Sequence, residues 1–306
     1  MSVQMSEKST LEMLEPKEIR VSVPWGHVAA RAYGSPVDFP VLLVHGVLDN
    51  AGSFHRLISH LPSNYYYVAI DLPGHGLSSH FPTGLPLNFL NYVLVLRYVI
   101  EEFNWPKLHI VSHSLGAQLS VFYTFIYPGR VQRLVVLEGF YPRVLSEHQL
   151  LPWIRKTLDS ATKQDTPWTY TREQVMHSLK FKRNFALNSA AAEAMFDRSV
   201  TKIGNDSYRY NRDPRLKTYF LPLLSHDQLI GLLQKVDVKI LGLFAQSSAE
   251  MYLPKAVRES AKLVEGLLDA KITFVPGNHD MHNNHPERVA PYIIAFLRDN
   301  NLVSKL

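Results

Sequence analysis

Short, continuous apolar runs recur along this chain and alternate with stretches of helical periodicity. Each run is four or five residues long and almost wholly apolar, which is typical of parallel strands that helices bury on both faces. This rhythm predicts an α/β fold with a mostly parallel, doubly wound sheet. The runs are Val41–Val44, Tyr66–Ile70, Leu108–Val111, Leu134–Leu137, Ile240–Phe244 and Ile272–Val275.

The N-terminal region reads differently. Residues 1–17 are polar and charged, and we expect them to form a flexible arm. Ile19–Val23 and His27–Ala32 then alternate apolar and polar residues around Pro24-Trp25-Gly26. Such alternation around a turn predicts an antiparallel hairpin at a half-exposed edge of the sheet.

The strand rhythm stops after Leu137. Residues 138–239 contain no strand-like run, and their patterns are helical. We interpret residues 141–235 as a helical lid inserted into a core made of residues 18–140 and 236–303. The expected lid helices are His148–Leu158, Arg172–Leu179, Ala190–Val200 and His226–Leu233. The aromatic residues of this insert would pack it onto the core or line an acyl pocket, and they are Trp153, Trp168, Tyr170, Phe181, Phe185 and Phe196.

A candidate nucleophile stands where one strand changes into a helix. The apolar run ends in Ser112-His113-Ser114-Leu115-Gly116, and a helical pattern follows at once. Small residues two before and two after a serine, at such a switch, are typical of a nucleophile elbow, which presents the hydroxyl above the sheet. The usual pattern is G-x-S-x-G, and Ser112 replaces its first glycine here. Ser114 is therefore the predicted nucleophile.

Two other loops fit around that serine. The run Val41–Val44 ends in His45-Gly46-Val47, which would place the Val47 N–H beside the elbow. Together with the Leu115 N–H it would form an oxyanion hole for acyl transfer. The segment Asp71–Gly76 follows the next strand, and we expect it to have a structural role, with Asp71 or His75 bonding backbone groups.

His279 follows the last strand-like run, in Pro276-Gly277-Asn278-His279-Asp280. A histidine there can reach over the sheet and act as the general base for Ser114. His282 and His285 recur at a spacing that could mimic a metal site, but the segment is a loop without supporting ligands upstream. We therefore predict no metal and no cofactor.

The sequence offers more than one carboxylate that could orient this histidine. The usual place is after the first strand beyond the lid, where Gln246-Ser247-Ser248 offers none and Glu250 is the nearest. Glu138 directly follows Leu134–Leu137, and a glutamate there is either buried and paired or catalytic. We favour Glu138 as the acid, with Glu250 as the alternative, because Asp280 is too close along the chain to hold the ring of His279.

Composition limits the partners. The chain has 306 residues, a formal charge of +5 and no cysteine, so disulfides and thiolate metal sites are excluded. Its basic residues are scattered, which disfavours a nucleic-acid face. The N-terminus lacks the pattern of a signal peptide, and no apolar run is long enough to span a membrane. Ser304-Lys305-Leu306 matches a peroxisomal address, so we expect recognition by the import receptor and a peroxisomal location, with the cytoplasm as a second location.

The order Ser114, Glu138, His279 is the nucleophile–acid–base order of α/β-hydrolases. The stretches 23–30, 45–51 and 71–80, the elbow and the segment 204–216 resemble the serine hydrolase-like protein family of that superfamily. The resemblance implies an α/β-hydrolase fold with Ser114 as nucleophile, and some family members are associated with peroxisomes. The sequence departs from the pattern at Ser112 and at the post-lid acid position.

The expected function is therefore that of a serine hydrolase, similar to a carboxylesterase or thioesterase. Ser114, His279 and Glu138 would cleave a carboxylic ester or thioester, on a small lipid-like or acyl substrate. The two departures leave open an alternative, a nearly inactive ligand-binding protein on the same scaffold.

Overall fold

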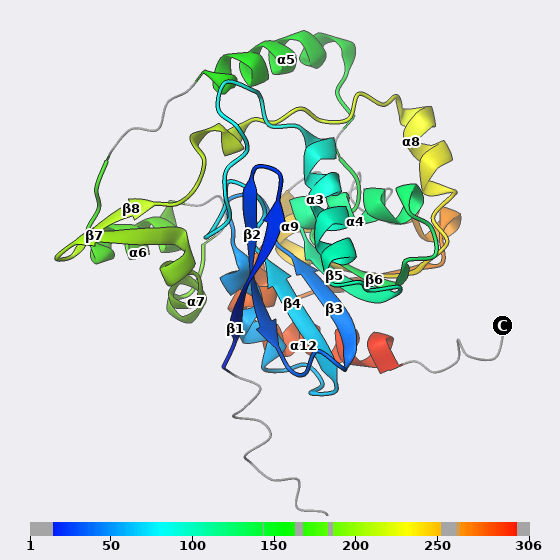
Figure 1. Cartoon of the computed structure of the whole chain (residues 1–306). Helices are drawn as coiled ribbons and strands as arrows, with labels where there is room; N and C mark the ends of the chain where they lie inside the picture. The colour runs from blue at the N-terminus through cyan, green and yellow to red at the C-terminus, as the bar shows by residue number, and fades with distance from the viewer. Residues whose placement is uncertain are drawn as a thin grey trace, which may run out of the picture.

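An eight-stranded sheet forms the centre of the molecule (Figure 1). The computed structural model describes residues 15–142, 144–162, 168–182, 186–251, 262 and 264–298. The strands lie in the order β1-β2-β4-β3-β5-β6-β9-β10. β2 pairs antiparallel with β1 and β4, and the other neighbours are parallel. The bounds are β1 Lys17–Val23, β2 Gly26–Tyr33, β3 Phe39–Val44, β4 Tyr65–Ile70, β5 Leu108–His113, β6 Val131–Leu137, β9 Lys239–Ala245 and β10 Ala270–Val275.

This sheet confirms the strands expected from the sequence. All six apolar runs lie within β3, β4, β5, β6, β9 and β10, whose pairing is parallel as their two-sided burial requires. The N-terminal hairpin is confirmed as well, with Val21 opposite Val28 across β1 and β2. Its turn ends at Gly26, whose φ of 139° lies in a region that favours glycine.

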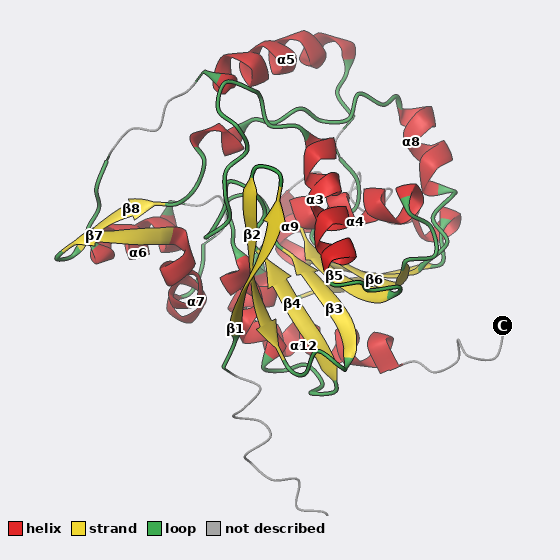
Figure 2. Cartoon of the chain, in the orientation of Figure 1, coloured by secondary structure: helices red, strands yellow, loops and turns green. Residues whose placement is uncertain are grey.

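Helices cover both faces of the sheet (Figure 2). α3 (Phe89–Glu102) and α4 (Leu115–Ile126) share one hydrophobic core with strand side chains such as Ile110. α2 (His55–Ile58) and α12 (Pro286–Arg298) share a second core on the opposite face. The strand ends that carry the candidate site therefore project from a sheet that is packed on both sides.

α12 shows why the sequence folds in this way. Val289, Ile293 and Leu297 recur every four residues, so they fall on one face of the helix and are buried against the sheet. Burying each of these side chains stabilises the fold by about 1.5–3 kcal/mol. Pro286 begins the helix, where its missing N–H costs no hydrogen bond.

The expected insertion leaves the sheet after β6 and returns at β9. Residues in this region form four helices at the predicted places, although α7 ends one residue before Val200. α5 lies at the top of the molecule in Figure 1, away from the other lid helices. The bounds are α5 Glu147–Ala161, α6 Arg172–Phe181, α7 Ser189–Ser199 and α8 His226–Leu233.

The expectation that the insertion contains no strands was wrong. β7 (Val200–Gly204) and β8 (Ser207–Tyr210) form an antiparallel hairpin beside α6 and α7. Its loop is Asn205-Asp206, and Asp206 has a φ of 48°. β7 is exposed except at Val200 and β8 is mostly half-buried, and neither strand has the continuous apolar run that marked the strands of the sheet. A two-residue polar loop was the available signal.

The hairpin and its two helices form a small module with its own core. Val175, Met195 and Phe196 pack with the apolar sides of Tyr170 and Tyr208. The ring of Phe196 meets that of Tyr208 edge to face at 5.3 Å between centroids. This part of the lid is thus a folded unit rather than a set of separate helices.

A buried arginine fastens that module to the core. The Arg198 side chain of α7 is fully buried and donates to both oxygens of Asp71 and to both oxygens of Glu18. Asp71 also accepts from the Ala51 and Leu77 N–H groups. Removing one partner of such a buried pair costs about 3–5 kcal/mol because the other charge is left uncompensated.

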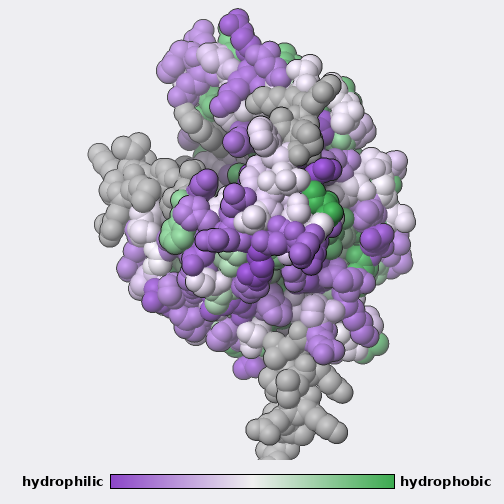
Figure 3. Space-filling model, turned by 90° about the vertical axis from the view of Figure 1, so that its left-hand side faces the viewer, coloured by the Kyte–Doolittle hydropathy of each residue, from purple (hydrophilic) through white to green (hydrophobic). Residues whose placement is uncertain are grey.

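Hydrophilic residues cover most of the face that carries β7 and β8, with only small hydrophobic areas between them (Figure 3). Among the described ranges, no helix combines the length and the apolarity that crossing a bilayer requires.

Candidate active site

Ser114 occupies a sharp turn between β5 and α4. Its φ of 51° is unusual for a residue with a side chain, and it forms the link between the last strand residue and the first helix residue. The Ser114 N–H donates to the Leu137 carbonyl of β6 at 2.8 Å. Gly116 lies so close to the end of β3 that a Cβ on it would collide with the Val44 carbonyl. The local geometry is that of a nucleophile elbow.

Ser112, which stands in place of the first glycine of the pattern, fits this turn. Its side chain is buried, and its hydroxyl donates to the Val135 carbonyl of β6 at 3.2 Å. The extra atoms thus point along the sheet toward the neighbouring strand rather than into the elbow. This departure from the pattern leaves the conformation of Ser114 intact.

Two glycines lie against Ser114 from opposite sides. A Cβ on Gly46, after β3, would come within 3.0 Å of the Ser114 Cβ and 2.9 Å of the His113 ring. A Cβ on Gly139, after β6, would collide with the Ser114 carbonyl oxygen. The ends of β3 and β6 therefore approach the serine as closely as backbone can, which only glycine allows.

The structure brings Glu138 and His279 together. His279 Nδ1 lies 2.9 Å from Glu138 Oε2. The Glu138 side chain is 2% exposed and the His279 side chain is 23% exposed, so the ring shields the carboxylate from solvent. The carboxylate engages Nδ1, and an imidazole oriented in this way can exchange a proton through Nε2. Glu138 itself has a φ of 57°, a left-handed conformation that is uncommon for a residue with a side chain.

The segment after β9 holds Glu138 from the other side. The Ser248 hydroxyl donates to Glu138 Oε2 at 2.6 Å, and the Ala245 N–H donates to Oε1. Burial by itself raises the pKa of Glu138, but the hydrogen bonds from His279, Ser248 and Ala245 outweigh it and hold the pKa below its ordinary value. The segment after β9 offers no carboxylate at the usual position of the acid, and it instead contacts the carboxylate of Glu138.

The two residues expected to supply the oxyanion hole lie at the start of α4 and in the turn after β3. Helix α4 begins at Leu115, so its N–H has no carbonyl to bond within the helix. Val47 lies in a turn in which the Asp49 N–H donates to the Gly46 carbonyl at 3.2 Å and Leu48 has a φ of 63°. Within the described part of the chain, no hydrogen bond uses the N–H of Val47 or of Leu115.

Two buried histidines support this turn. His75 Nε2 accepts from the Leu48 N–H at 3.1 Å, and His45 Nε2 accepts from the Leu72 N–H at 2.9 Å. Burial lowers the pKa of both rings, that of His75 to about 3, so both stay neutral. Together with the Asp71 bonds described above, these contacts give Asp71 and His75 the backbone-bonding role that was expected.

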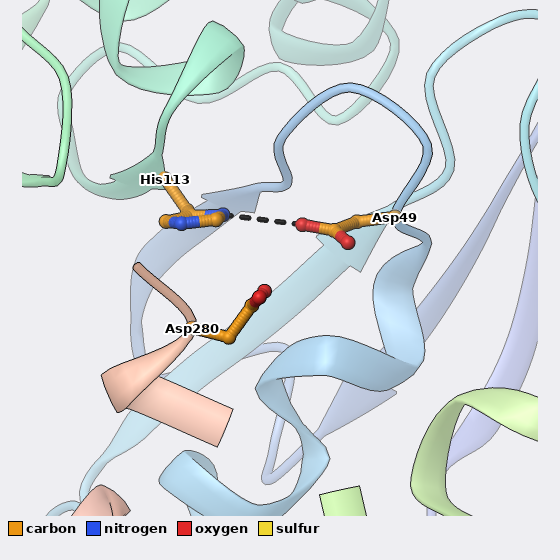
Figure 4. A group of neighbouring side chains, drawn as sticks. All are labelled: Asp49, His113 and Asp280. Atoms are coloured by element: carbon orange, nitrogen blue, oxygen red, sulfur yellow. Dashed lines mark hydrogen bonds and ion pairs between the residues drawn. The ribbon is translucent and has the colours of Figure 1, made fainter. Parts of the chain in front are cut away.

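A cluster of buried polar side chains lies at the end of β5 and includes His113, the residue before Ser114 (Figure 4). His113 Nδ1 is 3.2 Å from Asp49 Oδ2, and Asp280 points toward the same region. All three are buried, and their ligand atoms lie within 4.8 Å of one another, which makes them the group among the described residues that best matches a metal site. A proton between Nδ1 and Oδ2 is enough to explain the contact, so we describe the group as a hydrogen-bonded cluster.

The other histidines of this region do not join that group. His282 is buried with its ring 4.2 Å from that of His113, while His285 faces Glu287 at the surface. The spacing of His279, His282 and His285 therefore does not bring them together as one set of metal ligands.

Some residues singled out in the sequence lie outside the described part of the structure. Glu250 is in α9 (Gln246–Met251), but its side chain is outside the described part, and Phe185 and Ser304-Lys305-Leu306 are outside it altogether. Sequence reasoning also missed residues that hold the site. Ser248 and Ala245 gave no signal except their place after a predicted strand. The network of His113 gave none, because its partners come from distant segments.

Comparison with known proteins agrees with this geometry. Residues 40–191 match a family model described as alpha/beta hydrolase fold. Serine hydrolase-like protein 2 of Homo sapiens is 31% identical, covering 98% of this chain and 99% of its own. The serine hydrolase-like protein of Danio rerio is 31% identical over 92% of this chain and 88% of its own. A thioesterase domain from the curacin biosynthetic pathway superposes with a TM-score of 0.77 at 20% identity, covering 92% and 99% of the two chains, and shows the shared fold.

Proposed function

Because the chain belongs to the serine hydrolase-like proteins of the α/β-hydrolase fold, we propose that it cleaves carboxylic esters or thioesters through an acyl-enzyme. The observation that carries this proposal is the contact of His279 with Glu138, whose chain neighbour Gly139 lies against a serine held at a φ of 51°. A neutral imidazole oriented by a buried carboxylate is the arrangement that activates a serine hydroxyl.

The proposed reaction begins with Ser114. Its hydroxyl oxygen bonds to the acyl carbon while His279 Nε2 takes the hydroxyl proton. The negative oxygen of the tetrahedral intermediate receives hydrogen bonds from the Val47 and Leu115 N–H groups, and the N-terminus of α4 adds its positive dipole end. His279 then gives the proton to the departing alcohol or thiol, which leaves the acyl group on Ser114.

The second half repeats these steps with water. Water loses a proton to His279 and attacks the acyl carbon, and the carboxylic acid departs as Ser114 regains its proton. Glu138 stays ionised throughout and stabilises the imidazolium that forms twice in each cycle. We assign Glu138 to this role because it contacts Nδ1 directly and because three hydrogen bonds fix its carboxylate.

We propose a small lipid-like or acyl substrate. The lid supplies aromatic side chains, of which Trp168 and Phe181 are 67% and 63% exposed. Trp153 is partly buried, its indole N–H donates to the Tyr219 carbonyl at 3.2 Å, and its ring lines a cavity of the lid together with His148 and Pro152. The proposed substrate class therefore rests on the apolar side chains that the lid exposes and on the proposed hydrolase chemistry.

Labelling with a fluorophosphonate probe tests the nucleophile. We expect the wild-type protein to be labelled at Ser114 and Ser114→Ala to lose both labelling and turnover, because the serine and its histidine act as one unit. Ser112→Ala is the matched control, since its hydroxyl bonds β6, and it should still be labelled. A wild-type protein that stays unlabelled while a reference esterase reacts would contradict the proposal and favour a ligand-binding role.

A substrate panel distinguishes the reaction types. p-Nitrophenyl esters of short and long acids, measured beside acyl-CoA thioesters of the same acids, compare kcat/KM across chain length and leaving group. We expect measurable hydrolysis in at least one series, lost in Ser114→Ala.

We also propose that Ser304-Lys305-Leu306 directs the protein to peroxisomes through the import receptor. The support is the sequence motif alone. A fluorescent protein fused before the N-terminus should colocalise with a peroxisomal marker, and deletion of Leu306 should leave the fusion in the cytoplasm. Peroxisomal import of the truncated fusion would contradict the proposal.

A further inference from the structure

His113 precedes the candidate nucleophile and is 1% exposed at the end of β5. Both of its ring nitrogens have partners. Nε2 lies 2.9 Å from the carbonyl oxygen of His279, and Nδ1 lies 3.2 Å from Asp49 Oδ2. The reaction proposed above uses neither nitrogen, although one bonds the backbone of its general base.

The partners determine where the protons are. A carbonyl oxygen only accepts hydrogen bonds, so Nε2 carries a proton toward His279. An ionised Asp49 also only accepts, so Nδ1 carries a second proton. His113 is then an imidazolium, paired with a carboxylate in a buried site.

Three segments of the site meet at this ring. Asp49 ends the turn that contains Val47, His113 precedes Ser114, and the carbonyl belongs to His279. We propose that His113 is a positioning residue, which by donating to Asp49 and to the His279 carbonyl fixes the base relative to the nucleophile and the oxyanion turn. This inference rests on the proposed hydrolase function.

The surroundings of the ring support its charge. Burial lowers the pKa of His113, but the hydrogen bond and charge of Asp49, the charge of Asp280 and the bond to His279 outweigh it, so the pKa is raised. The titratable rings that face it are His279 and His282, with centroids at 4.8 and 4.2 Å. Gly46 makes room for the ring, since a Cβ there would come within 2.9 Å of Nδ1.

The two ends of His279 are thus held by different groups. Glu138 orients the imidazole through Nδ1, and His113 anchors the carbonyl of the same residue. Without the second contact the carboxylate still holds the ring, and Gly277 and Asn278 keep their own hydrogen bonds, but the bond from His113 to the His279 carbonyl is lost. A displacement of about 1 Å in a catalytic group can lower a rate by about 100-fold.

Substitutions at His113 separate its two hydrogen bonds. The amide nitrogen of glutamine can take the place of Nε2, whereas that of asparagine is near the place of Nδ1. We expect His113→Gln to keep kcat within about fivefold of wild type and His113→Asn to lose about 10- to 100-fold, with KM changed less than about twofold in both. His109→Gln is the matched control, because His109 is buried in the same strand away from the site, and its kcat should be unchanged.

Rescue by glutamine distinguishes positioning from packing. If asparagine and glutamine lower kcat equally, or if both merely lower the midpoint of thermal unfolding while kcat is kept, the inference is wrong. Loss of activity on EDTA treatment, with recovery on adding Zn²⁺, would also overturn it, because a metal would then occupy Nδ1.

A measurement without substrate keeps the inference separate from the proposed function. In protein labelled with ¹⁵N-histidine, the His113 ring should show two protonated nitrogens at about pH 7.5, assigned by their loss in His113→Gln. A singly protonated ring would contradict the inference even in an active enzyme. If His113 is doubly protonated but fluorophosphonate does not label the protein, only the proposed function is contradicted. In that case, equal ¹⁵N spectra of the His279 ring in wild type and His113→Asn would show that His113 does not position His279.

Discussion

Glu138 keeps a negative charge in a place that is almost closed to water. Its carboxylate accepts from the Ser248 hydroxyl and the Ala245 N–H and contacts His279, and these bonds replace the hydration that burial removes. The residue also has a positive φ, a conformation that costs free energy for any residue but glycine. The surrounding bonds therefore maintain a geometry that the local sequence alone would not favour.

The first residue-scale prediction concerns this charge. Glu138→Gln keeps the shape of the side chain but removes the anion that stabilises the imidazolium of His279. We expect kcat to fall by roughly 10²- to 10⁴-fold with KM little changed, measured with an ester that the wild type hydrolyses. Glu101→Gln, at an exposed pair with Arg130, is the control and should keep wild-type kcat. An unimpaired Glu138→Gln protein would return the acid role to Glu250.

The second residue-scale prediction concerns the departure from the usual elbow pattern. Ser112→Gly removes the bond to the Val135 carbonyl and places a flexible residue in β5. We expect the free energy of unfolding to fall by about 1–2 kcal/mol in urea titrations, while kcat stays within about twofold. A large change in kcat would show that the serine side chain influences the elbow after all.

At the scale of elements, the insertion divides into parts that are held differently. α6, α7 and the β7–β8 hairpin share a small core and are joined to the sheet through Arg198. Asn50, which caps the short helix after β3, adds bonds to the Met195 carbonyl and to Ser199 of α7. This module is therefore attached to the core by buried charges and by the hydrogen bonds of the Asn50 amide.

A substitution tests that attachment. Arg198→Met leaves Asp71 and Glu18 without their shared cation, and we expect the free energy of unfolding to fall by about 3–5 kcal/mol. Arg198→Lys keeps the charge but loses the planar fork, so its loss should be intermediate. Arg209→Met, on the exposed face of β8, is the control and should change stability by less than about 0.5 kcal/mol. Equal unfolding midpoints for Arg198→Met and Arg209→Met would contradict this account.

Some elements and residues could be predicted from the sequence, and others could not. The sheet strands were recognisable because each is apolar on both faces, and Ser114 and His279 because they follow such strands. The β7–β8 hairpin escaped because neither of its strands has a continuous apolar run. Glu138 was recognisable as a charge after four apolar residues, but its contacts with Ser248 and Ala245 depend on β9 lying beside β6. Arg198 and His113 were not recognisable as network residues, because sequence patterns do not pair segments so far apart.

At the scale of the whole molecule, buried histidines make stability depend on pH. His75 and His109 are buried, and burial lowers the pKa of each to about 3, so both stay neutral in the folded protein at about pH 5. In the unfolded chain these histidines take up protons below about pH 6.5, so the unfolded state binds more protons than the folded state. The free energy of unfolding therefore decreases as the pH is lowered. His113 acts oppositely, since its raised pKa makes its contribution present at low pH and lost as pH rises through that value.

We therefore expect the free energy of unfolding to be lower at about pH 5 than at about pH 7.5. Each neutral histidine contributes on the order of 2 kcal/mol to that difference. Urea unfolding at the two pH values measures it, and His109→Gln should reduce the difference by about one histidine's share. A larger free energy of unfolding at the acidic pH would show that the charged His113 dominates.

The position of Glu138 before the insertion has a consequence for how this protein can diversify. The proposed nucleophile, the proposed acid and both proposed oxyanion donors come from one continuous segment, Val47–Glu138, and the lid follows directly. Had the acid come from the loop after β9, a change in lid length could have displaced it together with the histidine. Here only His279 arrives from beyond the lid. The lid is thus free to be lengthened, trimmed or exchanged by recombination, while the proposed nucleophile, acid and oxyanion donors are inherited as a single block.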